Sequence, residues 1–230
     1  MSVRILVLAA LTLLNFTSAA IAADAPTPTI EHTGDWRAAV HRFVETNMKH
    51  PAWGLSHSIR DYELAKELAA SDKVQIDDDV LYAAAYLHDV AAFAPFSKSG
   101  VDHQDEAARI VESLLEGTGF PMAKIEAVRG AIRTHMFARD PEGPEALYLH
   151  DADALDWLGA IGVARVFGLV DPTGGSPDGP TVVKRLESTV TSVPPRILSR
   201  AGKARTPERL SELEQFLRAL RAESADYKSL

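Results

Sequence analysis

The sequence predicts an all-α protein, and three observations support this prediction. Apolar residues recur every three or four positions through most of the chain, which is the spacing of a helix with one buried face. No segment of useful length alternates apolar and polar residues in the way a half-buried strand does. Signals that start helices, such as Asp77-Asp78-Asp79 and Pro121, stand before several apolar stripes.

The composition narrows the function classes before any motif is considered. The chain has 230 residues, 46% of them hydrophobic, which is enough for one domain with a sizeable core. It has no cysteine, so disulfides, cysteine-bound zinc, iron–sulfur clusters and a thiol nucleophile are excluded. The 24 Lys and Arg against 32 Asp and Glu give a net charge of −8, which argues against binding a nucleic-acid polymer.

The N-terminal residues have the pattern of a secretory signal peptide. A short positive start is followed by 12 apolar residues at 5–16 and by small residues at 17–23. The apolar run is shorter than the roughly 20 residues that cross a bilayer, so no stable membrane span is expected. We therefore expect a signal peptide at 1–22, a disordered Pro-rich leader at 23–32 and one helical domain at 33–228, exported to the bacterial periplasm.

The first four expected helices span residues 35–49, 57–70, 77–93 and 102–115. Each has an apolar stripe on one face, and Asp102 is a suitable N-cap for the fourth. In order, the stripes consist of Trp36, Val40, Phe43 and Val44; of Leu64 and Leu68; of Val80, Ala84, Leu87 and Ala91; and of Ala107, Ile110 and Leu114. The first half of the chain should therefore be a bundle of amphipathic helices.

Four more expected helices complete the chain. One begins near Pro121, and the next is a single long apolar helix at 145–170. A Pro- and Gly-rich segment at 171–180 ends the long helix and should be an exposed loop. The last two helices span 181–192 and 207–225, and spare apolar positions on the final one could pack against a second subunit in a homodimer.

Histidines and aspartates occur where the apolar stripes point. Four stripes are interrupted or extended by a histidine, namely His57, His88, His103 and His135. On the expected helix at 145–170, Asp153 and Asp156 share the face of Leu149. A buried Asp is costly unless it is paired or bound to a metal, and imidazoles with carboxylates inside a helical bundle are a common metal site. The other histidines, which we expect to be surface or structural residues, are His32, His41, His50 and His150.

The spacing of these residues resembles a known superfamily. His57 in HSIRDYELA, the His88-Asp89 pair in LYAAAYLHDV and Asp153 in HDADALDWLGAIGVAR follow the pattern of the HD-domain metal-dependent phosphohydrolases. The segments DADALDWLGAIGVAR and TPERLSELEQFLRALRAE look like the bacterial branch that includes nucleotide pyrophosphohydrolases. The resemblance covers residues 50–228 and implies that the domain at 33–228 is an HD-domain helical bundle with a metal site between its helices.

The resemblance implies the metal ligands His57, His88, Asp89 and Asp153. Asp151 and Asp153 are about 200° apart on a helix, so both cannot face one ion, and only Asp153 shares the inner face. Asp156, one turn later, could orient a ligand or a water, and Asp151 is expected to be exposed or a histidine partner. Some HD branches hold two metals with two further histidines, so the site would hold one ion or, with His103 and His135, two.

The implied activity is hydrolysis of a phosphate ester or anhydride, with a nucleotide as the expected substrate. Two imidazoles and two carboxylates suit Mn, Fe, Co, Ni or Zn better than an all-oxygen Mg cage, although Mg stays among the candidates. The ion would activate a water that attacks phosphorus, with His88 and Asp89 at the reacting centre. Arg60 and Lys98 are the first candidates to offset phosphate charge, and the cations Arg133 and Arg139 flank His135.

Other readings stay open at this point. HSIRDY also resembles the HD hydratases that act on small nitriles such as cyanamide, and other HD relatives are diiron oxygenases. A hydratase site should be small and apolar and be lined by Phe93 and Phe96, whereas a phosphate site should gather cations. A third class is a non-catalytic binding domain that the metal merely stabilises. Retention of His57, His88, Asp89 and Asp153 argues against this third class.

Overall fold

The computed structural model describes residues 27–137, 139–170 and 178–230. The expected signal peptide lies outside these residues, as do part of the expected leader and most of the expected 171–180 loop. Every regular element in the described ranges is helical, which confirms the all-α prediction. The α-helices are α1 (Trp36–Asn47), α2 (Leu55–Asp72), α3 (Asp78–Leu87), α4 (His103–Leu115), α5 (Ile125–Arg133), α6 (Pro144–Asp156), α7 (Gly159–Phe167), α8 (Gly179–Ser192) and α9 (Arg200–Glu223). Three 3₁₀ turns accompany them, η1 (Val90–Ala92), η2 (Met122–Lys124) and η3 (Pro194–Arg196).

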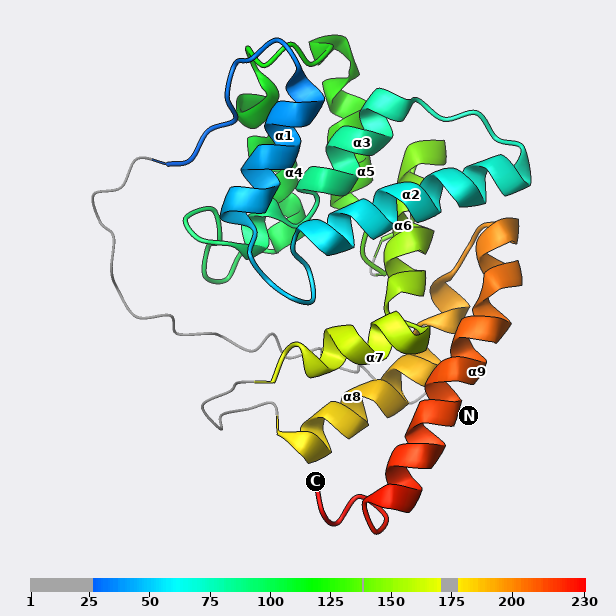
Figure 1. Ribbon diagram of the computed structural model, residues 1–230. Helices are drawn as coiled ribbons and strands as arrows, with labels where there is room; N and C mark the ends of the chain where they lie inside the picture. Colours follow the sequence, from blue (N-terminus) through cyan, green and yellow to red (C-terminus); the bar gives the residue numbers. More distant parts are fainter. Residues whose placement is uncertain (1–26, 138, 171–177) are drawn as a thin grey trace, which may run out of the picture.

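The helices form two groups that meet at α6. In Figure 1, α1 to α6 gather in one bundle, and α7, α8 and α9 lie together beyond the end of α6. Helix α2 packs along α6, and α3 contacts α2, α5 and α6. The interior between α2, α3 and α6 is therefore lined by three helices that are distant from one another in sequence.

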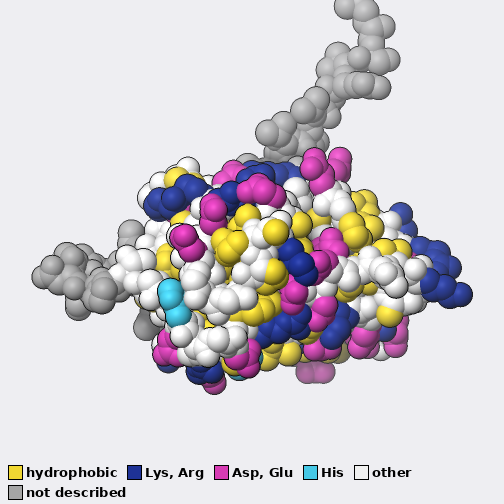
Figure 2. All heavy atoms as spheres, turned by 90° about the horizontal axis from the view of Figure 1, so that it is seen from above, with side chains coloured by type: hydrophobic (Ala, Val, Ile, Leu, Met, Phe, Trp, Pro, Cys, Tyr) yellow, Lys and Arg dark blue, Asp and Glu magenta, His cyan; other side chains and the backbone are white. Residues whose placement is uncertain are grey.

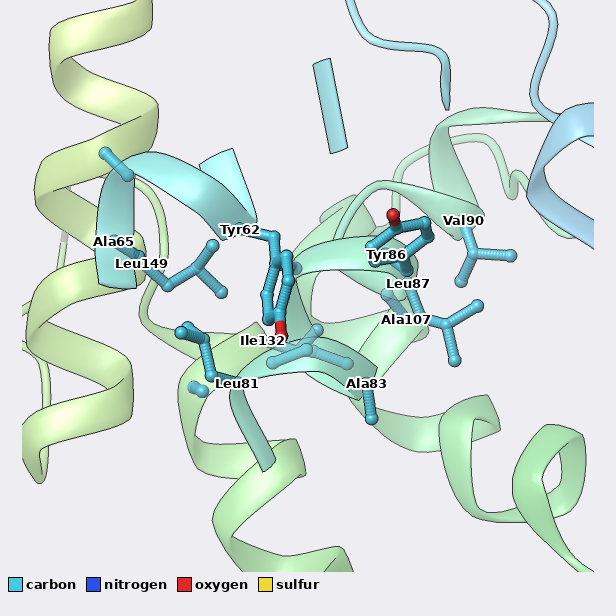
Figure 3. Packing of buried hydrophobic residues seen from close by; sticks show 14 of the residues in the cluster. Tyr62, Ala65, Leu81, Ala83, Tyr86, Leu87, Val90, Ala107, Ile132 and Leu149 are labelled. Atoms are coloured by element: carbon cyan, nitrogen blue, oxygen red, sulfur yellow. The ribbon is translucent and has the colours of Figure 1, made fainter. Parts of the chain in front are cut away.

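The core of the first bundle is continuous, and most of its side chains are apolar. Figure 3 shows Tyr62 of α2, Leu81 of α3 and Ile132 of α5 turned toward the same interior. Leu81 and Ile132 are fully buried, as is Leu149 of α6. Ile30, within the expected leader, is also buried in this core. Burial of this kind stabilises the fold by about 1.5–3 kcal/mol for each large apolar side chain.

The expected long helix at 145–170 is wrong, because the chain breaks it into α6 and α7. Helix α6 ends at Asp156, and Gly159 starts α7 in the left-handed region with φ of +66°. A Cβ on Gly162 would lie 2.1 Å from the carbonyl oxygen of Trp157, so the turn needs glycine there as well. The apolar period continues through this break, and periodicity alone therefore did not reveal it.

Two other helix boundaries differ from the expectation by six or seven residues. Helix α3 ends at Leu87 rather than Phe93, which places His88 and Asp89 at a helix end followed by η1. Helix α9 begins at Arg200, seven residues before the expected start, because Ser199 caps it by accepting from the backbone N–H of Gly202 (3.0 Å).

The surface carries both signs of charge. Figure 2 shows Lys and Arg side chains interspersed with Asp and Glu side chains on one face, with apolar groups between them. Among the described residues, no helix combines the length and the apolar character needed to cross a bilayer.

Candidate metal centre

Three helices deliver the site. Helix α2 carries His57 and Asp61, which lie one turn apart on the same face, and both side chains are fully buried. The end of α3 supplies His88 and Asp89, and α6 supplies Asp153. The Nε2 atom of His57 lies 3.2 Å from His88 Nε2 and 3.4 Å from Asp153 Oδ1. The structure therefore brings together the four residues that the sequence predicts as metal ligands.

Three of the imidazoles are held so that Nε2 faces inward. His57 Nδ1 lies 2.9 Å from Asp156 Oδ2, and His88 Nδ1 lies 2.9 Å from the carbonyl oxygen of Ala85. His135 Nδ1 lies 2.6 Å from another carbonyl oxygen, that of Ile132. A carbonyl and an ionised carboxylate can only accept, so each Nδ1–H donates outward and each neutral imidazole presents its Nε2 lone pair to the interior. Metal-bound histidines are oriented in the same way by partners of the other ring nitrogen.

Asp89 lies between two sets of histidines. Its Oδ2 atom is 3.3 Å from His88 Nε2 and 3.7 Å from His57 Nε2. Its Oδ1 atom is 3.4 Å from His103 Nε2 and 3.7 Å from His135 Nε2. The carboxylate therefore faces His57 and His88 with one oxygen and the two additional histidines with the other.

The site reaches solvent on the side of His103. The His103 side chain is 26% exposed and that of Asp89 is 12% exposed, whereas His57, His88 and His135 are buried. His103 is the first residue of α4, directly after its N-cap Asp102. A small molecule would therefore approach the buried donors past His103 and Asp89.

Two arginines hold the outer side of the site at α6. Arg60 donates through Nε and a terminal nitrogen to the two oxygens of Asp156, at 2.8 Å each. Arg165 of α7 is buried and lies 3.2 Å from Asp156 Oδ2 and 3.4 Å from Asp153 Oδ1. It also donates to His57 Nε2 (3.2 Å) and to the carbonyl oxygen of Ala52 (2.7 Å). Asp156 is thus a positioning carboxylate that connects Arg60, Arg165 and His57.

The protonation preferences follow from burial and from these neighbours. Burial and the Arg165 charge lower the pKa of His57 to about 4, so its imidazole is neutral near pH 7. Burial also lowers the pKa of His135. Burial alone would lower the pKa of His88, but the Asp89 carboxylate outweighs it and raises that pKa. Burial disfavours ionisation of Asp89, yet His88 and the other imidazoles hold its pKa well below the usual range. The surroundings of Asp89 and His88 thus favour a positive charge between them.

Two residues of this centre were not predicted as site residues. Asp61 stands four residues after His57, and this i, i+4 spacing on one helix face was the available signal. Arg165 is a lone charge in the apolar segment GAIGVARVF, where a buried arginine needs partners. Its guanidinium also stacks on Trp157, 3.8 Å from the ring centroid.

The other cations predicted to offset phosphate charge lie elsewhere. Lys98 pairs with Glu106 at 2.8 Å, and its side chain is half exposed. Arg139 donates to both oxygens of Asp105, and Arg133 approaches the same carboxylate at 4.0 Å. Only Arg60, of the four predicted cations, contacts a residue of the centre.

Asp151 lies outside the centre. It is buried beside His150 (Nδ1 to Oδ1, 3.1 Å) and accepts from the backbone N–H groups of Leu198 and Ser199. Of the two expectations for Asp151, the histidine partner is correct and the exposed residue is wrong. The face argument that separated it from Asp153 is confirmed by these contacts.

The donor chemistry fits a divalent ion. Two triads have donor atoms within 4.8 Å of one another, His57 with Asp61 and His88, and His88 with Asp89 and His135. Three buried atoms, the two carboxylate oxygens of Asp61 and the Nε2 of His135, have no hydrogen-bond partner within the described residues. Buried polar atoms of this kind are rare in proteins without a ligand. His57, His88, Asp89 and Asp153 would hold an ion, with His135 and His103 placed to extend the set.

The segment that carries most of these residues matches a known domain. A family model described as the HD domain matches residues 54–158, the segment from the start of α2 to the end of α6. Residues 54–158 thus match the HD domain, and the His-Asp pair within the matched segment is His88-Asp89. The all-α HD bundle that the sequence predicts is confirmed.

Solved structures share this fold. A protein from an uncultured Thermotogales bacterium, described as a predicted HD superfamily hydrolase, is 28% identical, with a TM-score of 0.57 over 84% of this chain and 94% of its own. An HD-superfamily hydrolase from Bacillus thuringiensis is 22% identical, with a TM-score of 0.58 over 82% and 94%. Bacillus subtilis YpgQ in complex with ADP is 19% identical, with a TM-score of 0.63 over 81% and 97%. No curated protein matches the chain.

Proposed function

We propose that the protein is a metal-dependent hydrolase of phosphate esters or anhydrides and that its substrate is a nucleotide. The observation that carries the proposal is the convergence of the His57 and His88 Nε2 atoms, 3.2 Å apart, with Asp89 and Asp153 beside them. Two imidazole lone pairs do not approach each other in this way unless a cation or a proton lies between them.

A bound divalent ion supplies an acidified water and polarises a phosphoryl oxygen. The residues of the chain provide the rest. Asp89 orients the groups around it through both oxygens, and Asp156 fixes the His57 ring through the Nδ1 contact of 2.9 Å. Arg60 and Arg165 keep Asp156 ionised, because burial raises its pKa but the arginine and histidine contacts lower it far more.

His103 is the candidate proton donor to the leaving oxygen. It is the most exposed histidine of the centre, and its Nε2 atom lies 3.4 Å from Asp89. Burial alone would lower its pKa, but the contact with Asp89 raises it above the ordinary value. Protonated His103 would therefore be available near neutral pH at the side from which the substrate enters.

The experiment that tests the proposal is metal analysis of the purified protein followed by a phosphate-release panel. The panel should cover nucleoside mono-, di- and triphosphates and simple monoesters, each with Mn²⁺, Fe²⁺, Co²⁺, Ni²⁺, Zn²⁺ and Mg²⁺. Adenine nucleotides come first in the panel, because the YpgQ crystal holds ADP. We expect bound metal and release of phosphate or pyrophosphate that chelation abolishes.

A protein that binds metal but is inert on every phosphate would contradict the proposal. Hydration of cyanamide by that protein would support the hydratase reading instead, and oxygen consumption with two irons would support the oxygenase reading. Phe96, one of the two apolar residues expected to line a hydratase pocket, is buried against Phe43, with ring centroids 6.0 Å apart.

A further inference from the structure

A fifth donor lies inside the centre. On the basis of the proposed metal-dependent function, we propose that Asp61 is a direct ligand of the ion, so that the donor set is two imidazoles and three carboxylates. Asp61 lies on α2 one turn after His57, and its side chain is fully buried. Neither the expected ligand set nor the His-Asp pair of the HD domain includes it.

The distances around His57 Nε2 support this assignment. Four donor atoms lie between 3.2 and 3.7 Å from it: Asp61 Oδ2, His88 Nε2, Asp153 Oδ1 and Asp89 Oδ2. Ligands that share one ion at bonds of about 2.1 Å are separated by roughly 3.0–3.4 Å. Asp61 Oδ2 is as close to His57 Nε2 as His88 Nε2 is, and it is 3.9 Å from His88 Nε2.

The lack of other partners distinguishes Asp61 from a structural carboxylate. Within the described part of the chain, neither of its oxygens accepts a hydrogen bond, although both are buried. The nearest ring nitrogen, His57 Nε2, cannot donate when Nδ1–H is given to Asp156. His57 Nε2 accepts from Arg165 (3.2 Å) and so presents no N–H to the Asp61 carboxylate 3.2 Å away, an arrangement that a cation between them stabilises.

The charges of the surroundings point the same way. Asp61, Asp89, Asp153 and Asp156 are four carboxylates, and the guanidinium groups that contact them are those of Arg60 and Arg165. Arg60 is directed to Asp156, and Arg165 is directed to Asp153 and Asp156. Among the described residues, Asp61 therefore has no lysine or arginine contact. A divalent ion offsets the formal excess of two negative charges.

A third carboxylate also changes which ion the centre prefers. Carboxylate oxygens suit Mn²⁺ and Mg²⁺, whereas a set with more imidazole favours Zn²⁺ and its neighbours. Asp61 should therefore increase the preference of the site for the harder ions. Removing its charge should weaken Mn²⁺ binding more than Zn²⁺ binding.

The test measures metal binding and stability of the full-length protein without substrate. Wild type and Asp61→Asn are stripped with a chelator and titrated with Mn²⁺ by electron paramagnetic resonance and with Zn²⁺ by calorimetry. We expect Asp61→Asn to weaken Mn²⁺ binding at least tenfold and Zn²⁺ binding less. Without metal, Asp61→Asn should melt at or above the wild-type Tm, because an unpartnered buried charge has been removed. Added Mn²⁺ should raise its Tm less than that of the wild type.

Asp72→Asn is the matched control. Asp72 ends the same helix, accepts from the backbone N–H of Ala201 (3.1 Å) and contacts Arg200, so its loss should lower the Tm and leave the Mn²⁺ affinity unchanged. An Asp61→Asn protein that binds Mn²⁺ as the wild type does, or that is less stable without metal, would overturn the assignment. Weak Mn²⁺ binding by Asp61→Asn together with an inert, metal-loaded wild type would support the ligand and contradict only the proposed hydrolysis.

Discussion

Two clusters of carboxylates in this protein differ in how their charge is balanced. The start of α3 carries Asp77, Asp78 and Asp79 near the surface, and these residues are neutralised by the chain itself. Arg37 donates to Asp78 and Asp79, and Lys124 donates to Asp77 and Asp79, with all four contacts at 2.7–2.8 Å. The second cluster, in the interior between α2, α3 and α6, includes Asp61, Asp89, Asp153 and Asp156.

The difference shows what separates an acidic patch from a metal centre. In the surface cluster, solvent, lysine, arginine and helix N–H groups together stabilise the charges, and these contacts hold the pKa of Asp79 below its usual range. In the interior, the buried imidazoles present lone pairs instead of N–H groups, and Asp61 has none of these partners among the described residues. The two clusters have similar numbers of carboxylates, but the chain supplies much less positive charge to the interior cluster than to the surface cluster.

The largest expected effect follows from removing an inner imidazole. His88→Ala should lose metal binding and reduce turnover by at least about 100-fold, since changes to residues one step further out commonly cost 10–100-fold. Metal content and phosphate release at saturating metal measure the two losses. Lys124→Met is the control from the surface cluster, and it should keep both. A His88→Ala protein that retains its metal and its turnover would show that the metal centre is assigned to the wrong residues.

A smaller effect is expected from Arg165, which supplies part of the missing positive charge. Arg165→Met leaves Asp153 and Asp156 with fewer cations in a buried site, and breaking such a pair typically costs about 3–5 kcal/mol. Urea unfolding with and without Mn²⁺ checks this. The loss in the free energy of unfolding should be smaller with metal, because the ion then offsets part of the negative charge of Asp153 and Asp156. An equal loss in both conditions would indicate that Arg165 acts through its contacts with Ala52 and Trp157 alone.

In the surface cluster the same kind of substitution should matter less. Arg37→Met removes contacts to Asp78 and Asp79 that are partly exposed, and such pairs contribute about 1 kcal/mol or less. The wild-type advantage should shrink in 1 M NaCl, because salt screens exposed charges. Unfolding in urea at low and high salt measures the difference in stability between the wild type and Arg37→Met. Added Mn²⁺ should leave this difference unchanged. A stabilisation that depends on Mn²⁺ would remove the distinction between the two clusters.

The sequence predicts the inner cluster better than its surroundings, for a physical reason. The predicted metal ligands converge because each lies on the apolar face of its helix or at the end of that helix. The helical period indicates such positions in the sequence; the ligands are His57, His88, Asp89 and Asp153. Arg165 was not predicted as a site residue, because an arginine is usually exposed. Only the fold shows that α7 places it in the interior. Lys98 was expected near phosphate, but the loop after η1 places it on Glu106, a contact that no periodic pattern encodes.

The fold was predictable to the same extent. Helices with clear stripes, such as α1 and α4, lie close to where the sequence places them. The break between α6 and α7 depends on the left-handed backbone of Gly159 and on the close approach of Gly162 to Trp157. These are local backbone constraints that the apolar period of 145–170 does not show, and the two glycines were the available signal.

Glu106 of α4 sharpens the comparison, because it is a buried carboxylate that the chain does neutralise. Arg109 donates to both of its oxygens, and Lys98 lies 2.8 Å from Oε1. The Arg109 contact is the main reason that the pKa of Glu106 falls to about 2. Because this pKa lies below that of the unfolded chain, near 4.3, the unfolded state binds more protons between the two values. The stabilisation by Glu106 is therefore present above pH 4.3 and is lost as the pH falls toward 2.

This titration gives a prediction whose effect disappears at low pH. Glu106→Gln should be less stable than the wild type at pH 6, and the difference should decrease steadily as the pH is lowered from about 4.3 to 2. Urea unfolding of both proteins across this range measures the difference, which removes the contribution of all other acidic groups. Added metal should not change it, since Lys98 and Arg109 already supply the positive charge that Asp61 lacks. A difference in stability that stays constant down to pH 2 would mean that Glu106 contributes by packing and not by its charge. Burial, rather than the balance of charge, would then be what distinguishes the interior carboxylates from the surface cluster at the start of α3.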